Sequence, residues 1–303
     1  MDFHQQCDNQ HVADVPVVTS SHVGTLPIDE IDAACTSSLG ALQELKILGP
    51  SYALPLLQLG LSVYNLDTDL LIDLKPDIIM TCRQIAHSAM LDGKLCEIAL
   101  ESVLGYVPKV VHCDTNNMKD VWRNMLDIAT ALALADAGAK FVESQKKSMS
   151  QLSMISSGRS RPNVCCIQWI RPLMAGSAWV PELVSMSGGT DVCGRVEEAV
   201  IISEETLLQA SPDIIIFALC GVKLSVAVKA AQKALKKSLQ TLLSASPAGV
   251  TRRIAAVDGN RILSRPGPCL SESLECLIEI LHPEAQSFGH EGKNWQWIPV
   301  DGS

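Results

Sequence analysis

Two stretches of this chain, LLIDLKPDIIMTC at residues 70–82 and LLQASPDIIIFALC at residues 207–220, repeat one pattern. Each has a leucine pair, a proline followed by DII, and a final cysteine. Asp67 and Ser203 precede them as candidate helix caps and are followed by acidic residues, which favour a helix N-terminus. The proline ends the helix, and the apolar run after it predicts a buried strand. The chain therefore repeats one helix–turn–strand unit, once in each of two lobes.

Short apolar runs, many of them β-branched, alternate with helical patterns along the whole chain. This alternation predicts an α/β fold of two Rossmann-like lobes with mainly parallel sheets. Ligands bind at the carboxyl ends of strands in open α/β sheets, so the ends of the two repeated strands, residues 81–84 and 219–222, are expected to face a shared cleft. The predicted strands are residues 15–20, 76–82, 109–114, 163–169, 212–220 and 253–259.

A long stretch of helix-forming residues lies between the two halves of the chain. Residues 117–156 contain no proline and a single glycine, and apolar residues from Val121 and Met125 onward recur at three- and four-residue spacing. We predict one continuous spine helix, roughly 50 Å long at 1.5 Å per residue. The expected organisation is an N-terminal α/β lobe at residues 1–116, the linking helix at 117–156 and a C-terminal α/β lobe at 157–303.

The composition is that of an ordinary globular protein, with 47% hydrophobic and 19% charged residues. A net charge of −9 disfavours nucleic acid as a partner. The glycine-rich phosphate-binding motifs, the G-x-S-x-G nucleophile motif and the H-E-x-x-H zinc motif do not occur. The sequence therefore favours a protein that is not an enzyme.

The cysteines and the N-terminus bear on the compartment. Eleven cysteines occur at irregular spacing without a C-x-x-C pair, which indicates free thiols and a reducing compartment. The first residues, MDFHQQCDNQHVADVP, lack the charged and apolar regions of a secretory signal. No uninterrupted apolar stretch reaches about 18 residues, so no membrane span is expected. We therefore predict a cytoplasmic protein.

Two segments carry residues suited to ligand binding. QWIRPLMAGSAW, at residues 168–179, places Trp169 at a strand end and Trp179 in the following loop, and planar indoles suit a large flat ligand. The alternative is that one tryptophan fills the base of a lobe. SRPGPC, at residues 264–269, has two prolines that rigidify the loop and would present Arg265 to an anionic group. The alternative there is a rigid turn with a solvated arginine.

At these motifs the chain resembles the class III periplasmic substrate-binding proteins, the helical-backbone metal-receptor group, and within it the cobalamin-binding branch of ABC transporters. The resemblance covers most of residues 7–298. The motifs that carry it are VPVVTSSHV, LKPDIIMTC, IQWIRPLMAGSAWVPELVSMSGG, SPDIIIFALCGV, VDGNRILSRPGPCLSESLECLIEILHPE and FGHEGKNWQWIP.

The resemblance implies two α/β lobes joined by one long helix, and a corrinoid, heme or iron-chelate ligand in the cleft between the lobes. The sequence departs from the family pattern at four places. Gln168 replaces a glutamate, Cys269 replaces an arginine, and TCRQIAHS at residues 81–88 replaces a pattern richer in cysteine. The first lobe is also expected to lack the family's opening strand and helix.

The leading hypothesis is a non-enzymatic intracellular protein that binds a cobalamin-like corrinoid or related metal-tetrapyrrole and requires no cofactor. The expected contacts are Trp169 and Trp179 on the flat face of the ligand, Arg265 with the backbone of Gly221 and Gly267 at its polar periphery, and Thr19, Ser20, Cys82 and Arg83 in the opposite lobe. Cys82 and Cys220, at strand ends, are candidates for an axial ligand.

Two alternatives remain open at this point. One is an enzyme that reuses the fold for corrinoid or nucleotide modification, and the other is a degenerate scaffold that has lost its ligand. The predicted partner is a small metal chelate, with neither nucleic acid nor a membrane. Delivery to an ABC transporter is disfavoured by the predicted cytoplasmic location.

Overall fold

The structure is a computed structural model that describes residues 19–21, 64–81, 100–196, 200–237, 239 and 252–299. The chain divides into two compact units. The first comprises Met1–Asp114 and Asp127–Ala133, and the second comprises Thr115–Leu126 and Leu134–Ser303. The predicted loss of an opening strand and helix falls on residues outside the described ranges.

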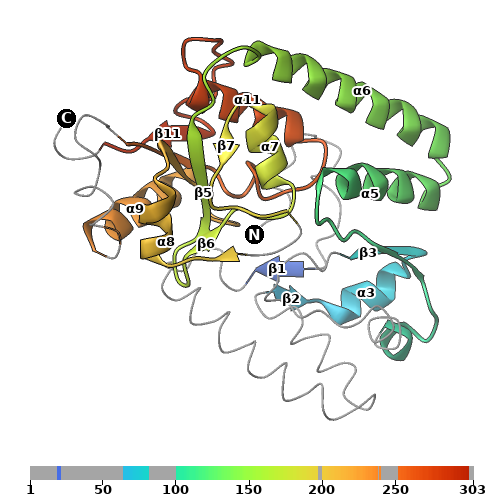
Figure 1. Cartoon of the computed structure of the whole chain (residues 1–303). Helices are drawn as coiled ribbons and strands as arrows, with labels where there is room; N and C mark the ends of the chain where they lie inside the picture. Colours follow the sequence, from blue (N-terminus) through green and yellow to red (C-terminus); the bar gives the residue numbers. More distant parts are fainter. Residues whose placement is uncertain are drawn as a thin grey trace. The chain divides into compact units, whose positions relative to one another are not determined.

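The described part of the first unit contains two strand pairs and the first copy of the repeated motif (Figure 1). Strand β1 (Thr19–Ser21) pairs antiparallel with β2 (Tyr64–Leu66). Helix α3 (Thr68–Leu74) follows, and then β3 (Ile78–Thr81), which pairs in parallel with β4 (Lys109–His112).

The second unit is built on a seven-stranded sheet in which β5, β9 and β10 form a parallel centre. The strand order is β11-β10-β9-β5-β6-β8, and β7 also pairs in parallel with β5. The strands are β5 (Asn163–Trp169), β6 (Met174–Ala175), β7 (Thr190–Asp191), β8 (Val200–Ile201), β9 (Ile214–Phe217), β10 (Arg253–Val257) and β11 (Trp295–Trp297).

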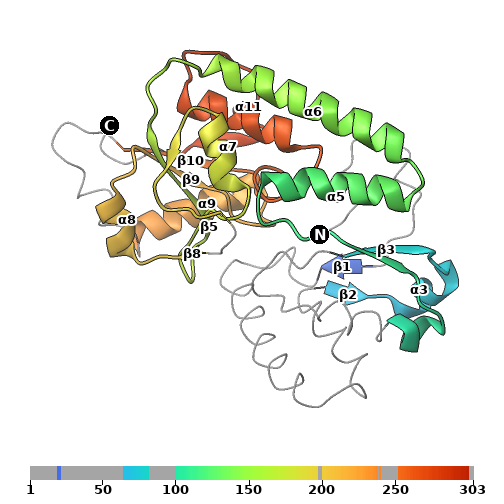
Figure 2. The same cartoon turned by 45° about the vertical axis from the view of Figure 1, so that its right-hand side comes forward.

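Helices cover both faces of this sheet (Figure 2), which explains why every residue of β9 is buried. Helices α7 (Val180–Met186) and α11 (Leu270–Leu281) pack in one core cluster with Val164 and Cys166 of β5. Helix α9 (Leu224–Lys236) contacts β9 and β10. Cys165 lies between the two residues that join the cluster, so its side chain points to the opposite face.

The repeated motif adopts the predicted conformation in both units. Asp67 Oδ1 accepts a hydrogen bond from Leu70 N (2.9 Å) at the start of α3. Ser203 Oγ accepts one from Thr206 N (3.0 Å) at the start of α8 (Glu204–Ala210). Each helix is seven residues long, and each is followed by the proline and a strand. The sequence repeat is therefore a structural repeat.

The next strand pairs with each repeated strand in the same way. Lys109 N donates to Asp77 O (2.9 Å) in the first unit, and Arg253 N donates to Asp213 O (3.0 Å) in the second. All six predicted strands overlap observed strands. The sequence missed β2, β6, β7, β8 and β11, which have only two or three residues each and too little periodicity to detect.

The predicted continuous spine helix is wrong, because residues 117–156 form two helices. Helix α5 (Met118–Ala131) ends at a break where Ala133 has a φ of 59°, and α6 (Ala135–Ile155) follows. In one straight helix Trp122 and Lys146 would lie roughly 36 Å apart at 1.5 Å per residue. Instead Lys146 Nζ lies 5.8 Å from the centre of the Trp122 ring, so the chain turns back on itself.

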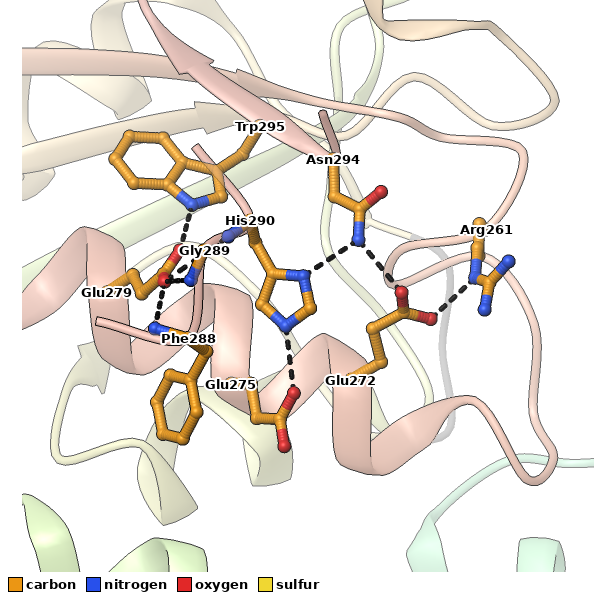
Figure 3. Close-up of polar contacts among 9 residues, drawn as sticks. All are labelled: Arg261, Glu272, Glu275, Glu279, Phe288, Gly289, His290, Asn294 and Trp295. Atoms are coloured by element: carbon orange, nitrogen blue, oxygen red, sulfur yellow. Dashed lines mark hydrogen bonds and ion pairs between the residues drawn. The ribbon is translucent and has the colours of Figure 1, made fainter. Parts of the chain in front are cut away.

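The C-terminal segment is fastened to α11 by a buried carboxylate, Glu279 (Figure 3). Glu279 Oε1 accepts backbone hydrogen bonds from Phe288, Gly289 (2.7 Å) and His290 (3.3 Å). Its other oxygen accepts the Trp295 indole N–H at 2.6 Å. These donors outweigh the cost of burial and lower the pKa of Glu279. One side chain therefore organises the loop that leads into β11.

A second set of contacts from α11 continues this network (Figure 3). Glu272 accepts from Arg261 Nε (2.5 Å) and from Asn294 Nδ2 (2.8 Å). The His290 ring lies between Asn294 (3.0 Å) and Glu275 (2.8 Å). The loop after β10 and the C-terminal segment are thus held on the same helix.

Candidate functional site

The carboxyl ends of the parallel strands β5, β9 and β10 meet at one side of the second unit's sheet. Past the end of β9, Ala218 N donates to Ile167 O (2.8 Å) and Cys220 N donates to Gln168 O (3.2 Å). Gly221 N then donates to Gly259 O, after β10, at 2.9 Å. We call the residues gathered here the strand-end edge: Gln168, Trp169, Cys220, Gly221, Gly259 and Arg265.

Gly259 is what allows the loops after β9 and β10 to approach so closely. A Cβ atom at this position would lie 1.8 Å from Leu219 O, a backbone atom that cannot swing away. Sequence reasoning did not single out Gly259. The available signal was a glycine placed directly after a buried strand, in the motif VDG.

Three side chains of the strand-end edge offer different chemistry. Trp169 is partly exposed at the end of β5. Cys220 is exposed, and the Ser264 hydroxyl and the Arg265 guanidinium lie close to its thiol. Arg265 is itself partly exposed. An aromatic plane, a thiol and a fixed positive charge are therefore presented from the ends of three neighbouring strands.

Trp179 does not belong to this surface. It is 5% exposed, lies directly before α7 and packs in the core cluster with Val180 and Leu183. Its predicted contact with a flat ligand is therefore replaced by the alternative, in which one tryptophan fills the base of the lobe. The two indoles differ in exposure because of their places in the fold. Trp169 is the last residue of β5, whereas Trp179 directly precedes α7, which packs in the core cluster.

The two predicted backbone contacts of the glycines stay predictions. The Gly221 N–H donates to Gly259 O at 2.9 Å, so a ligand contact of this backbone would use the Gly221 carbonyl. Gly221 has a φ of 75°, which suits glycine at this turn. A Cβ atom added to Gly267 would meet no atom within 4 Å, so this glycine borders open space, and its carbonyl accepts from Leu270 N (3.1 Å).

The residues predicted in the first lobe are placed only in part. Thr19 and Ser20 lie in β1, opposite Leu66 and Asn65 of β2. Cys82 and Arg83 lie outside the described residues. The predicted contact of these four with the second lobe stays a prediction.

Two open cavities of the second unit lie away from the strand-end edge, along α5 and α6. One, of about 610 Å³, is lined by Met118, Met149, Ser153 and Glu182 among others. The other, of about 530 Å³, is lined by Lys119, Trp122, Arg123, Leu126 and Lys146. Trp122 and Lys146 border both cavities. Sequence reasoning missed these cavities, because both require Trp122 and Lys146 to lie together and the predicted continuous helix would keep them apart.

Within the described ranges no group of three or more His, Cys, Asp or Glu side chains could hold a metal ion. In the same ranges no helix has the length and hydropathy needed to cross a membrane. Of the six residues that form the strand-end edge, Cys220 is the one with a His, Cys, Asp or Glu side chain.

The fold of this chain is that of the class III periplasmic substrate-binding proteins, as its motifs predicted. No protein-family model and no curated protein matches the sequence. Solved structures that share the fold include a periplasmic heme-binding protein from Pseudomonas aeruginosa, with a TM-score of 0.59 and 15% identity over 78% of this chain and 82% of that one.

Two further structures support the same fold. An ABC transporter substrate-binding protein from Listeria monocytogenes EGD-e has a TM-score of 0.58 and 16% identity, over 72% of this chain and 81% of that one. The periplasmic heme-binding protein HutB of Vibrio cholerae has a TM-score of 0.55 and 18% identity, over 72% and 82%.

The predicted cytoplasmic location is wrong on this comparison, because proteins that share the fold are periplasmic. That prediction rested on the first residues of the sequence and on its free thiols. Neither feature determines the compartment in which two folded lobes work.

Proposed function

We propose that this protein binds a metal-tetrapyrrole or a related metal chelate at the strand-end edge, without catalysing a reaction. The observation that carries the proposal is the meeting of Trp169, Cys220 and Arg265 at the ends of β5, β9 and β10. An indole matches a flat ring system, a thiolate is a metal ligand, and a guanidinium pairs with a carboxylate at the ring periphery.

The fold supports this class of ligand, because two of the proteins that share it are described as heme-binding. We further propose an extracytoplasmic location, with an ABC transporter as partner, in line with the description of the Listeria protein. The only argument against such a partner was the predicted cytoplasmic location. Within the ligand class, the sequence motifs favour cobalamin and the structural neighbours favour heme.

The test is titration of the purified full chain with hemin and, separately, with cyanocobalamin and a ferric chelate. Absorbance of the ligand and fluorescence of tryptophan are followed together with the unfolding temperature. A ligand at 100 times its Kd is expected to stabilise the folded state by about 2.7 kcal/mol. The proposal is contradicted when none of the three changes its absorbance or raises the unfolding temperature.

Variants locate the site once a ligand is found. Trp169→Ala and Arg265→Gln are each expected to weaken binding about tenfold, equivalent to about 1.4 kcal/mol, without a large change in unfolding temperature. Cys220→Ser is expected to alter the absorbance spectrum of the bound metal, while the matched control Cys269→Ser leaves it unchanged. Full affinity in the Trp169 and Arg265 variants would place the ligand elsewhere on the protein.

A further inference from the structure

Two cysteines of the second unit, Cys165 and Cys193, lie side by side although they are distant in sequence. Cys165 is in β5, and Cys193 follows β7, which pairs in parallel with β5. The pairing places Val164 opposite Asp191, and Val192 N donates to Val164 O at 2.9 Å. Cys193 therefore lies in the segment beside Cys165, and each thiol affects the pKa of the other more strongly than any other group does.

The turn that carries Cys193 is held firmly in place. Asp191 Oδ1 accepts hydrogen bonds from Cys193 N (3.0 Å) and Gly194 N (2.6 Å). A Cβ at Gly194 would lie 2.6 Å from both Asp191 Oδ2 and Gly176 O, so the turn is closely packed as well. The backbone at Cys193 is therefore held in place beside β5.

The two thiols are not equivalent. Cys193 is 9% exposed, whereas Cys165 is fully buried. The interaction with Cys165 lowers the pKa of Cys193 although burial opposes this, and the interaction with Cys193 together with burial raises the pKa of Cys165. Cys193 is thus the thiol that an external reagent reaches first and the one that is more readily a thiolate.

We propose that Cys193 and Cys165 form a reversible disulfide, with Cys193 as the attacking thiol and Cys165 as the resolving one. The Cys193 thiolate attacks an external disulfide, forms a mixed disulfide and expels one thiolate. The Cys165 thiol then loses its proton and attacks the Cys193 sulfur, which releases the second thiol. Two protein thiols are oxidised and one external disulfide is reduced to two thiols, so electrons and protons balance.

The bond would cross-link β5 to the turn after β7 and close the segment from Cys165 to Cys193. That segment contains Trp169 at the strand-end edge and the whole of α7. Oxidation is therefore expected to restrict the backbone around the candidate site. The proposal does not depend on which ligand the site binds, since it rests on the two thiols alone.

The experiment oxidises the folded full chain with oxidised glutathione, blocks the remaining thiols and maps the peptides by mass spectrometry. The expected product is a peptide pair linked through Cys165 and Cys193, which dithiothreitol separates. Exposed Cys220 serves as an internal check that the reagent is active, because it should acquire glutathione. Glutathione on Cys220 without a Cys165–Cys193 link in the wild-type protein overturns the proposal.

Serine variants test the order of the two steps. Cys165→Ser is expected to stop at the mixed disulfide, with glutathione retained on Cys193, and Cys193→Ser is expected to leave Cys165 unmodified. The matched control is Cys166→Ser, a neighbour in β5 that is equally buried but points to the other face, and it should still form the link. Loss of the link in the Cys166→Ser variant, with its circular dichroism unchanged, would also contradict the assignment.

Discussion

Lys75 and Ser211 end the helices of the two repeated motifs with the same left-handed backbone, each with a φ of 46°. Both residues precede a proline, which disfavours continuation of the helix at that position. The left-handed residue turns the chain from the helix into the strand. The residue after the proline, Asp77 or Asp213, then accepts a backbone hydrogen bond from the first residue of the next strand. One local sequence therefore gives one local structure in two separate units.

This conformation predicts that glycine stabilises the second motif. A non-glycine residue with left-handed φ costs about 1–2 kcal/mol, and part of the gain from glycine is offset by its greater freedom in the unfolded chain. Ser211→Gly is expected to raise the free energy of unfolding by about 0.5 kcal/mol in urea denaturation. Ser211→Ala, which keeps a Cβ atom, is the control and should give no gain. An alanine variant more stable than the glycine variant would contradict the explanation.

The strand-end edge predicts a sharp difference between two glycines. Gly259→Ala places a Cβ against Leu219 O, so a backbone atom must move. This variant is expected to lower the free energy of unfolding by about 3 kcal/mol or more, as severe changes in a protein core do. Gly267→Ala borders open space and should change stability by less than about 0.5 kcal/mol. Thermal unfolding of both variants checks this. Equal stability of the two variants would show that the fold does not require the close contact between residue 259 and Leu219 O.

The Glu279 contacts predict a large loss when the carboxylate is removed. Glu279→Ala leaves the Trp295 indole and three backbone N–H groups without their acceptor, and is expected to cost about 3 kcal/mol. Glu284→Gln, which breaks an exposed ion pair with Arg159, should cost less than about 1 kcal/mol. Urea denaturation compares the two. A loss for Glu279→Ala as small as that for Glu284→Gln would mean that the loop does not depend on this carboxylate.

His282 predicts a pH dependence of stability. Burial lowers the pKa of His282 below its ordinary value of 6.5, and Gly188, Glu284 and Arg159 surround its ring. Below pH 6.5 the unfolded chain takes up a proton that the folded protein does not, so the free energy of unfolding falls as the pH falls through this value.

Urea denaturation at pH 8 and pH 5.5 measures this dependence. His282→Asn, which cannot take up a proton, is expected to lose less stability between the two pH values than the wild-type protein. An identical pH dependence in the two proteins would show that His282 does not contribute.

Much of the fold followed from the sequence because it is decided within short segments. The six main strands are continuous apolar runs, and the caps at Asp67 and Ser203 act on residues three positions away. The location of the candidate site at strand ends followed from the expected parallel order. These features need no knowledge of which distant residues meet.

Other features depend on contacts that the order of residues does not reveal. The break between α5 and α6 contains no proline, and α6 packs against α11, which lies more than 100 residues further along the chain. Trp169 and Trp179 have similar surroundings in sequence, yet only Trp179 is buried in the core. The need for Gly259 becomes visible only when Leu219 lies against it.

The sequence by itself determined the repeated helix–turn–strand unit, the α/β class and the strands that end at the candidate site, because backbone preferences and apolar runs act over a few residues. The tertiary structure decided which tryptophan stays partly exposed, which glycine has no room for a side chain, and that Cys193 lies in the segment beside Cys165. Those outcomes depend on close packing between segments far apart in the chain, and packing is settled only when the whole unit folds.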